Sequence, residues 1–210
     1  MDITSTLNQI ILNPNLHGLW LNTLSYLEYR GFRKIARSQK SASIDAEILF
    51  HAAEEVRHAL FFKKLALKLG TNKFRTYQDS ELLGDFSAKK YFYDIDTGVA
   101  NLLTKDSTFE SYILISWLIE VRAMSVYTIY NELLLAAGQT ISLDSILREE
   151  GRHLEKLKEL SSAIFQKTKL PIKAFESIEK NAFQIFWKEI SRHTHEAIGE
   201  KLNLGTEINL

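Results

Sequence analysis

Two five-residue segments of the sequence are nearly identical and carry side chains of the kind that bind metal ions. EEVRH spans residues 54–58 and EEGRH spans residues 149–153, so four of the five positions are the same. The pattern Glu-x-x-His occurs nowhere else in the chain. A glutamate and a histidine three positions apart lie on one face of a helix. The two pairs are Glu55 with His58 and Glu150 with His153.

A further glutamate precedes each repeated segment by about the length of a helix–turn–helix unit. LEYRG carries Glu28 and IEVRA carries Glu120, each in the pattern Glu-x-Arg-small. In four antiparallel helices, the four carboxylates and two imidazoles can meet at the centre. Burial and mutual repulsion make four ionised carboxylates too costly without cations. Two divalent cations would balance the four charges, and a sulfur-free, oxygen-rich ligand set suits iron or manganese.

The composition limits both the chemistry and the class of protein. The chain has no cysteine, which excludes thiolate zinc sites and iron–sulfur clusters. The 26 basic and 26 acidic residues give a formal net charge of zero, which argues against a general nucleic-acid binder. One domain over residues 1–210 is expected, since 45% of the residues are hydrophobic. No signal-peptide pattern and no long uncharged apolar stretch is seen, so a cytoplasmic protein is expected.

The distribution of proline and of helix-forming residues predicts an all-α fold. Both prolines lie near the ends of long periodic segments rich in Leu, Ala, Glu and Lys. Ser107 and Glu110 can form a capping box at the start of one helix. Helices are predicted before Pro14 and over residues 15–41, 43–70, 107–138, 140–169 and 171–204. Residues 71–106 form a long connection that contains a weaker helical segment at 87–104.

This pattern resembles the ferritin-like di-iron carboxylate superfamily. Its members use an antiparallel four-helix bundle with one long crossover, a Glu from each of two helices and a Glu-x-x-His from each of two others. The resemblance covers about residues 15–169 and leaves a short N-terminal helix and a long fifth helix outside the bundle. It implies one ion held by Glu28, Glu55 and His58 and a second held by Glu120, Glu150 and His153. It also implies that Glu55 and Glu150 bridge the ions, while Glu28 and Glu120 are terminal ligands.

A different interpretation is that these six residues are ordinary surface charges on amphipathic helices. The segments 49–50, 59–62 and 113–119 are apolar and leave little polar face around the six residues. The pattern therefore favours burial of the six side chains.

Small and aromatic residues lie one or two helical turns from the candidate ligands. Gly31 and Ala123 follow the two upstream glutamates by three positions. They either leave space beside the metals for oxygen, peroxide or a substrate, or they allow close helix packing. Trp117, Tyr112 and Tyr127 either take part in redox chemistry or belong to the core.

His51 precedes Glu55 by four positions and shares its helix face. It is a candidate seventh ligand, similar to the third histidine of the arylamine N-oxygenase relatives. In that group the extra histidine belongs to the second Glu-x-x-His helix, where this chain has Ile146. The alternative is a histidine that orients a ligand or packs in the core. His193 and His195 are two positions apart and are expected to face solvent.

Charged residues flank the candidate ligands in both halves of the chain. They are Glu54, Arg57, Glu149 and Arg152. We expect ion pairs with Arg30 and Arg122 on neighbouring helices, which would orient the ligands. The alternative is ordinary exposed pairing, which contributes little to stability.

The resemblance implies a non-haem dinuclear oxidoreductase that activates O2 or peroxide and oxidises an unidentified small molecule. Two divalent ions are expected, iron first, with manganese or a mixed pair as alternatives. A separate electron donor is expected, because the Cys-x-x-Cys module of rubrerythrins is absent. Alternative functions are a rubrerythrin-like peroxidase, ferritin-type iron storage and a non-enzymatic helical binding module. The basic segment 63–75 leaves tRNA hydroxylation as a further alternative function. The protein is expected to have no membrane partner. A homodimer is one possible oligomeric state.

Overall fold

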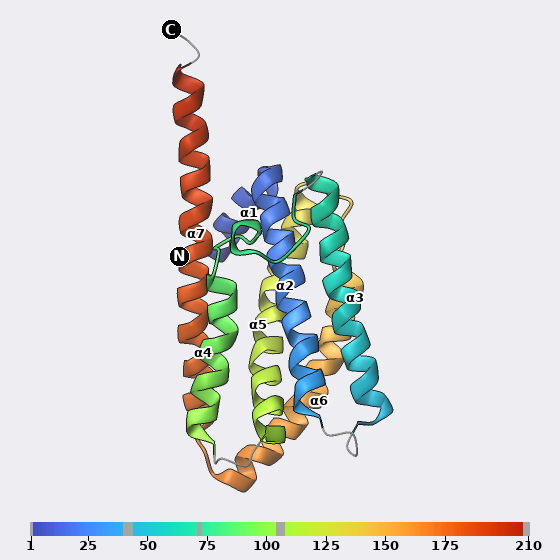
Figure 1. The fold of residues 1–210 in the computed structure, drawn as a ribbon. Helices are drawn as coiled ribbons and strands as arrows, with labels where there is room; N and C mark the ends of the chain where they lie inside the picture. The colour runs from blue at the N-terminus through green and yellow to red at the C-terminus, as the bar shows by residue number, and fades with distance from the viewer. Residues whose placement is uncertain (1, 40–43, 71–72, 104–107, 208–210) are drawn as a thin grey trace.

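The protein is all-helical over the part of the chain that the structure describes. The computed structural model describes residues 2–39, 44–70, 73–103 and 108–207, in which there are seven α-helices and no strand. The helices are α1 (Ile3–Leu12), α2 (Pro14–Ser38), α3 (Ala46–Leu69), α4 (Ser87–Leu102), α5 (Thr108–Ala136), α6 (Asp144–Thr168) and α7 (Ile172–Glu207), with the short 3-10 helix η2 (Asp79–Glu81) before α4 (Figure 1). The predicted all-α class is confirmed.

The helix limits follow from capping chemistry. Asn13 caps α2 through its side-chain oxygen, and Pro14 occupies the first turn, where a missing N–H costs nothing. α3 begins at Ala46, slightly later than predicted, because the Asp45 carboxylate accepts the backbone N–H of Ile48 at 2.9 Å. An uncapped chain would fray at these ends, so the caps set where each helix starts.

Some expected features lie outside the described residues. Ser107 of the expected capping box is one of them. Residues 40–43 hold the predicted end of one helix and the start of the next, and they are outside as well. The same applies to residues 71–72 and 104–106 of the long connection.

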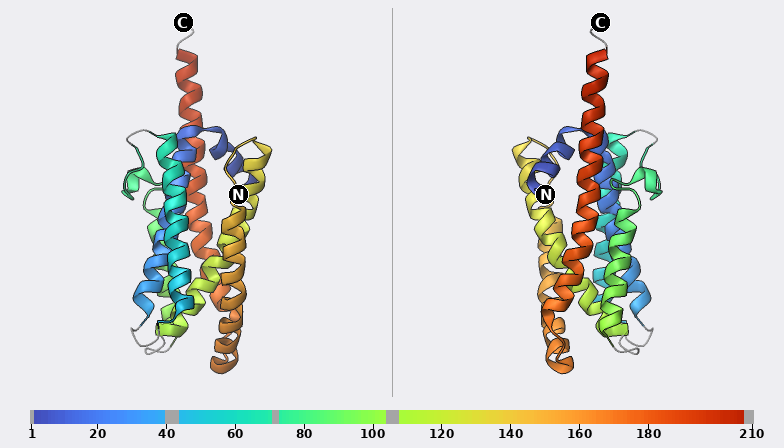
Figure 2. Two further views of the ribbon diagram at one scale, coloured as in Figure 1. Left: turned by 90° about the vertical axis from the view of Figure 1, so that its right-hand side faces the viewer. Right: turned by 90° about the vertical axis from the view of Figure 1, so that its left-hand side faces the viewer.

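Six of the α-helices pack in three neighbouring pairs, and α5 is the helix that contacts the most other α-helices. α2 lies along α3, α5 along α6, and α4 along α7 (Figures 1 and 2). α5 also contacts α1, α2, α4 and α7, and α3 contacts α6. The long connection between α3 and α5 carries α4 across the molecule to α7. This arrangement brings the two repeated segments, on α3 and α6, to face each other.

The apolar character of α5 follows from its central position. By length and composition alone, α5 could cross a membrane. In the fold it is surrounded by other helices, and Leu114, Ile115, Tyr130 and Leu134 are fully buried. A helix that is covered on most sides is expected to be apolar on most sides.

An aromatic cluster joins α2, α5 and α7. Trp20 meets Tyr130 and Trp187 edge to face, with ring centroids 6.3 and 5.8 Å apart. His17 Nε2 lies 2.5 Å from the Tyr130 hydroxyl. Burial lowers the pKa of His17 to about 4, so the buried ring is neutral at pH 7.

Protonation of His17 is expected to make folding stability depend on pH. The pKa of His17 is about 4 in the folded protein and near 6.5 in the unfolded chain, so the unfolded state binds the proton more tightly. Stability is therefore complete above pH 6.5 and falls as the pH drops towards 4, by about 2 kcal/mol between pH 7 and 5. Denaturant unfolding of metal-free protein at both pH values would measure this. His17→Gln should reduce the loss by that amount, and an equal loss in both proteins would contradict the prediction.

Candidate metal centre

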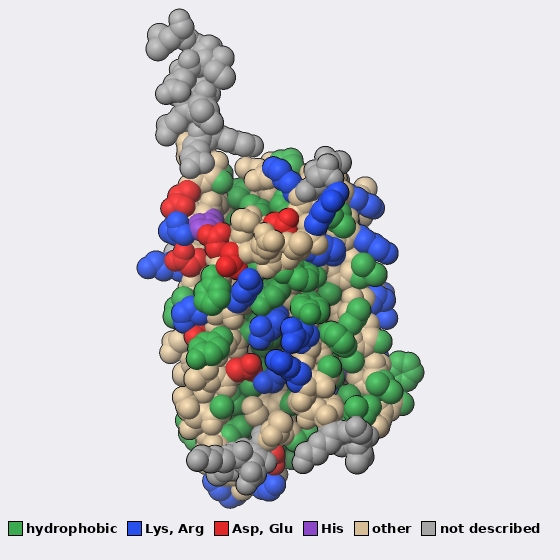
Figure 3. All heavy atoms as spheres, viewed as in Figure 1, with side chains coloured by type: hydrophobic (Ala, Val, Ile, Leu, Met, Phe, Trp, Pro, Cys, Tyr) green, Lys and Arg blue, Asp and Glu red, His purple; other side chains and the backbone are tan. Residues whose placement is uncertain are grey.

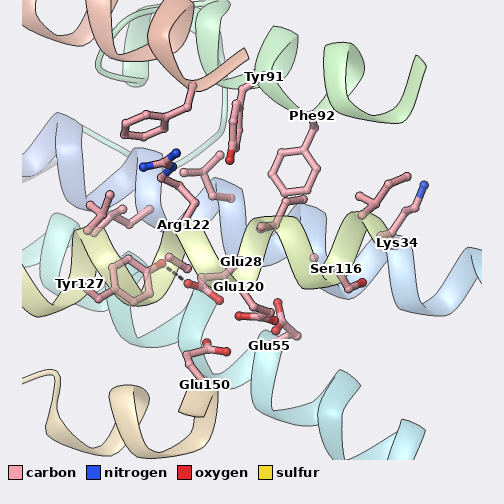
Figure 4. Close-up of a pocket in the computed structure, with 18 of the residues that line it drawn as sticks. Glu28, Lys34, Glu55, Tyr91, Phe92, Ser116, Glu120, Arg122, Tyr127 and Glu150 are labelled. Atoms are coloured by element: carbon pink, nitrogen blue, oxygen red, sulfur yellow. Dashed lines mark hydrogen bonds between the residues drawn. The ribbon is translucent and has the colours of Figure 1, made fainter. Parts of the chain in front are cut away.

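The six predicted ligands come from four helices and meet inside the protein. Glu28 lies on α2, Glu55 and His58 on α3, Glu120 on α5, and Glu150 and His153 on α6. Each is at most 8% exposed. Figure 4 shows the four carboxylates directed toward one another on one side of a pocket. The interpretation of these residues as solvent-facing surface charges is therefore wrong.

The potential ligand atoms form two groups, each with its atoms within 4.8 Å of one another. One group is His51, Glu55, Glu120 and His153, and the other is Glu28, His58 and Glu150. The predicted sets differ, because they placed Glu55 with His58 and Glu150 with His153. Spacing along a helix fixes the shared face of a Glu-x-x-His pair. It does not decide which neighbouring helix the carboxylate reaches.

Glu150 lies between the two groups. Its Oε1 is 2.8 Å from His58 Nδ1, and its Oε2 is 3.1 Å from His153 Nδ1. One carboxylate thus presents an oxygen to each histidine, which is the position that a bridging ligand needs. Glu28 Oε2 lies 3.6 Å from the same His58 nitrogen and completes that group.

His51 lines the site together with the predicted ligands. Its Nε2 lies 3.3 Å from Glu55 Oε1 and 3.7 Å from Glu120 Oε1, and its ring packs against that of His153 at 4.0 Å. Burial and the neighbouring His153 lower its pKa to about 4, so the ring keeps its lone pair. His51 Nε2 is buried without a hydrogen-bond partner. An orphaned ring nitrogen aimed at carboxylates fits a site that holds cations.

Without cations, the cluster must hold protons. Burial, then repulsion from neighbouring glutamates, raises the pKa values of Glu55 and Glu120 well above the usual range. Burial also raises the pKa of Glu150, but hydrogen bonds with His153 and His58 outweigh it and lower the pKa overall. Hydrogen bonds with Glu150 and Glu28 overcome the effect of burial on His58 and raise its pKa to about 11. Divalent cations would replace these protons and satisfy the same oxygens and nitrogens.

The flanking charges pair across the bundle in a way that differs from the prediction. Glu149 accepts from Arg57 at 2.5 Å and lies 2.7 Å from His58 Nε2. Glu54 accepts from Arg152 at 3.0 Å and lies 2.7 Å from His153 Nε2. Each glutamate therefore accepts from both the arginine and the candidate ligand histidine of the opposite segment.

The prediction that Glu54 and Glu149 form ion pairs with Arg30 and Arg122 is wrong. Arg122 forms a two-hydrogen-bond pair with Glu179 of α7, with both distances 2.8 Å, and Tyr91 donates to the same carboxylate. Arg30 instead donates to the Tyr26 hydroxyl at 3.3 Å and lies over the Phe92 ring. Glu179 is 5% exposed and gave no signal in the sequence, because Glu176 and Glu196 of the same helix look alike in the sequence and are exposed.

Gly31 makes room for one of the candidate ligands. A Cβ at this position would collide with the Glu55 carboxylate, so a larger residue would displace it. Ala123 lines the same pocket and is half-buried. The space beside Gly31 is thus taken by the Glu55 carboxylate of the neighbouring helix, and room for oxygen, peroxide or a substrate beside Ala123 stays a prediction.

A cavity of about 70 Å³ borders the carboxylates. Its walls come from α2, α4, α5 and α7, and most of the side chains that line it are apolar. Figure 4 shows Tyr91 and Phe92 opposite Glu28, Glu55 and Glu120. The volume is several times that needed for one water molecule, so a small apolar group can approach the candidate metal centre.

The nearby aromatic residues have different environments. The Tyr127 hydroxyl donates a hydrogen bond to Glu28, which joins it to the site. Tyr112 is buried, and burial followed by the nearby Glu55 raises its pKa. Trp117 is partly buried and packs edge to face on Phe165 at 5.8 Å.

The two histidines of α7 take no part in either group of ligand atoms. His193 is half-buried, where its Nδ1 accepts the backbone N–H of Gly84 at 3.2 Å. His195 is exposed. The expectation of solvent exposure is thus correct for His195 and wrong for His193, because the loop before α4 covers one side of its ring.

No protein-family model matches this chain, and no curated protein or solved structure matches it either. The buried histidine and glutamate groups, which could hold metal ions, are therefore the observations on which a function must be based.

Glu54 and Glu149 are expected to strengthen metal binding without touching the metal. Each accepts from a histidine Nε2 and so leaves Nδ1 facing the carboxylates. Glu54→Gln or Glu149→Gln should weaken metal binding about 10- to 100-fold, measured by competition with a chromophoric chelator. Glu47→Gln is the matched control, since Glu47 also lies on α3 and is exposed. Affinities equal to that of the control would contradict this role.

Proposed function

We propose that this protein is an oxidoreductase of the ferritin-like di-iron carboxylate type. It would use two divalent metal ions to activate O2 or peroxide and to oxidise a small, largely apolar substrate. The observation that carries the proposal is the pair of buried ligand groups, His51–Glu55–Glu120–His153 and Glu28–His58–Glu150, next to an apolar cavity.

Charge balance supports two cations. The four glutamates carry four negative charges when ionised, and burial makes such a cluster unfavourable on its own. Two divalent ions neutralise it, whereas one would leave two carboxylates uncompensated or protonated. Imidazole and carboxylate ligands without sulfur suit iron, with manganese or a mixed pair as alternatives.

The helix arrangement supports the ferritin-like assignment. α2 packs on α3 and α5 on α6, and the connection that joins these two pairs is the long one. That connectivity, with a Glu-x-x-His on one helix of each pair, is the one used by di-iron carboxylate bundles.

The side chains around the metals would have different roles in the reaction. Bound ferrous ions would supply electrons for the reduction of O2 or peroxide. Glu150 lies where it can bridge, and Glu54 and Glu149 fix the orientation of the two histidines. Tyr127 donates to Glu28 and holds that carboxylate in place. The apolar walls of the cavity exclude water and position the substrate.

The cavity favours substrate oxidation over iron storage. A storage site needs a path for hydrated iron, whereas this cavity is lined mainly by apolar side chains. Electrons would come from a separate donor, and a cytoplasmic location forms part of the proposal.

Reaction of the iron-loaded protein with oxygen tests the proposed function. Anaerobically loaded wild-type protein should bind two Fe2+ per chain and show a new absorption within seconds of mixing with O2 or peroxide. Glu55→Ala and Glu150→Ala should lose at least one ion and the absorption change, because each removes a carboxylate from one of the groups. Elemental analysis and stopped-flow absorption measure both.

Glu159→Ala is the matched control, because Glu159 is exposed on the same helix as Glu150. It should behave like wild type. Two metals retained in both active-site variants would contradict the ligand assignment. Full iron loading of wild type with no response to either oxidant would contradict the oxidoreductase proposal.

A further inference from the structure

A second hollow, larger than the cavity, opens on the surface between α2, α4 and the start of α5. It has a volume of about 540 Å³, and we call it the basic groove. Four of its lining residues are Arg30, Arg33, Lys34 and Arg37, at helix positions i, i+3, i+4 and i+7 of α2. Figure 3 shows Lys and Arg side chains gathered in the middle of this face, with apolar side chains and an acidic one beside them.

Most of this positive charge has no acidic partner. Lys34 pairs with Asp96 at 2.6 Å. Within the described part of the chain, no carboxylate lies within 4.0 Å of the guanidinium groups of Arg30, Arg33 or Arg37. On a chain with zero formal net charge, three neighbouring arginines without counter-charges form a local site for an anion. Ser38, Thr108 and Ser111 add hydroxyl groups to the same groove.

The basic groove and the cavity share a wall. Lys34 and Phe92 line both. The Arg30 guanidinium lies over the Phe92 ring, 5.4 Å from its centroid. In Figure 4 Lys34 lies at one end of the cavity, and Phe92 lies opposite the carboxylates. A molecule with its polar end at the arginines would reach Glu55 and Glu120 by passing Phe92 and Lys34, which line both hollows.

We infer that the basic groove binds the oxyanion of an amphiphilic substrate, a carboxylate or phosphate carried on an apolar body that enters the cavity. This inference rests on the proposed function, since it names the substrate class of the same site. Arginine binds such groups through paired N–H donors, and the apolar walls favour a hydrocarbon part. The apolar walls of the cavity disfavour a charged group, so the charged end of the substrate stays outside, at the arginines.

Direct binding of decanoate, decyl phosphate and decylamine tests the inference. Calorimetry on wild-type protein should detect decanoate or decyl phosphate, and the stronger of the two identifies the oxyanion. Decylamine should bind at least about tenfold more weakly, because it places a cation beside the arginines. The triple variant Arg30→Gln, Arg33→Gln, Arg37→Gln should weaken binding of the anion by at least about tenfold.

Two further variants test whether the loss of anion binding comes from the lost charge or from a change in side-chain shape or in folding. The corresponding triple replacement by Lys keeps the charge but removes the paired N–H donors, so it should bind the anion more weakly than wild type and more tightly than the Gln triple. Lys173→Gln, Lys180→Gln, Lys188→Gln removes three exposed charges from α7 and should bind as wild type does. Equal losses in the Lys and Gln triples of α2, or in the α7 control, would overturn the inference. So would equal binding of decylamine, or binding of an RNA oligonucleotide but of neither decyl anion.

Iron content and oxygen reactivity of the same proteins distinguish this inference from the proposed function. The α2 variants should load two Fe2+ per chain and react with O2 as wild type does, since no arginine of the groove belongs to a ligand group. Reactive iron with no anion binding would overturn the inference alone. Anion binding without reactive iron would overturn the proposed function and leave only an anion site.

Discussion

The buried cluster of carboxylates and imidazoles is the constraint on which the rest of the structure depends. Glu28, Glu55, Glu120 and Glu150 lie together at 1–7% exposure, where ionised carboxylates are strongly disfavoured unless something positive lies among them. Protonated histidines can compensate only part of this charge. The buried ring nitrogen of His51 lacks a hydrogen-bond partner, which fits a cluster that holds cations.

The two halves of the bundle hold this cluster through each other. Glu54 of α3 accepts from His153 of α6, and Glu149 of α6 accepts from His58 of α3. The arginines at these corners are largely exposed, so their ion pairs add little stability by themselves. Their value lies in orienting the glutamates, which in turn fix the histidine rings. Folding of either half alone would leave its histidine without its partner.

Much of the helical framework could be predicted from the sequence, because proline, capping residues and long periodic segments act locally. The burial of the six ligands could also be predicted, since apolar residues flank Glu55, Glu120 and their counterparts. The distribution of Glu55 and Glu150 between the two groups could not be predicted, because it depends on which helix each side chain reaches across the bundle. The partners of Glu54, Glu149 and Arg122 depend on tertiary distances in the same way.

His51 and Glu179 show two further limits of sequence reasoning. The spacing of His51 from Glu55 placed it on the ligand face, but only its proximity to Glu120, a residue of another helix, brings it into a ligand group. Glu179 looks like any exposed glutamate in the sequence. Its burial against Arg122 and Tyr91 arises from the way α7 closes over α4 and α5.

The central claim is that a pair of cations occupies the two groups of ligand atoms. Anomalous diffraction from crystals grown anaerobically with Fe2+ would test it most directly. We predict two peaks about 3.5–4 Å apart, one beside Glu28 and His58 and the other beside Glu120 and His153, with Glu150 between them. A single peak, or none with the glutamates turned away from one another, would contradict the account.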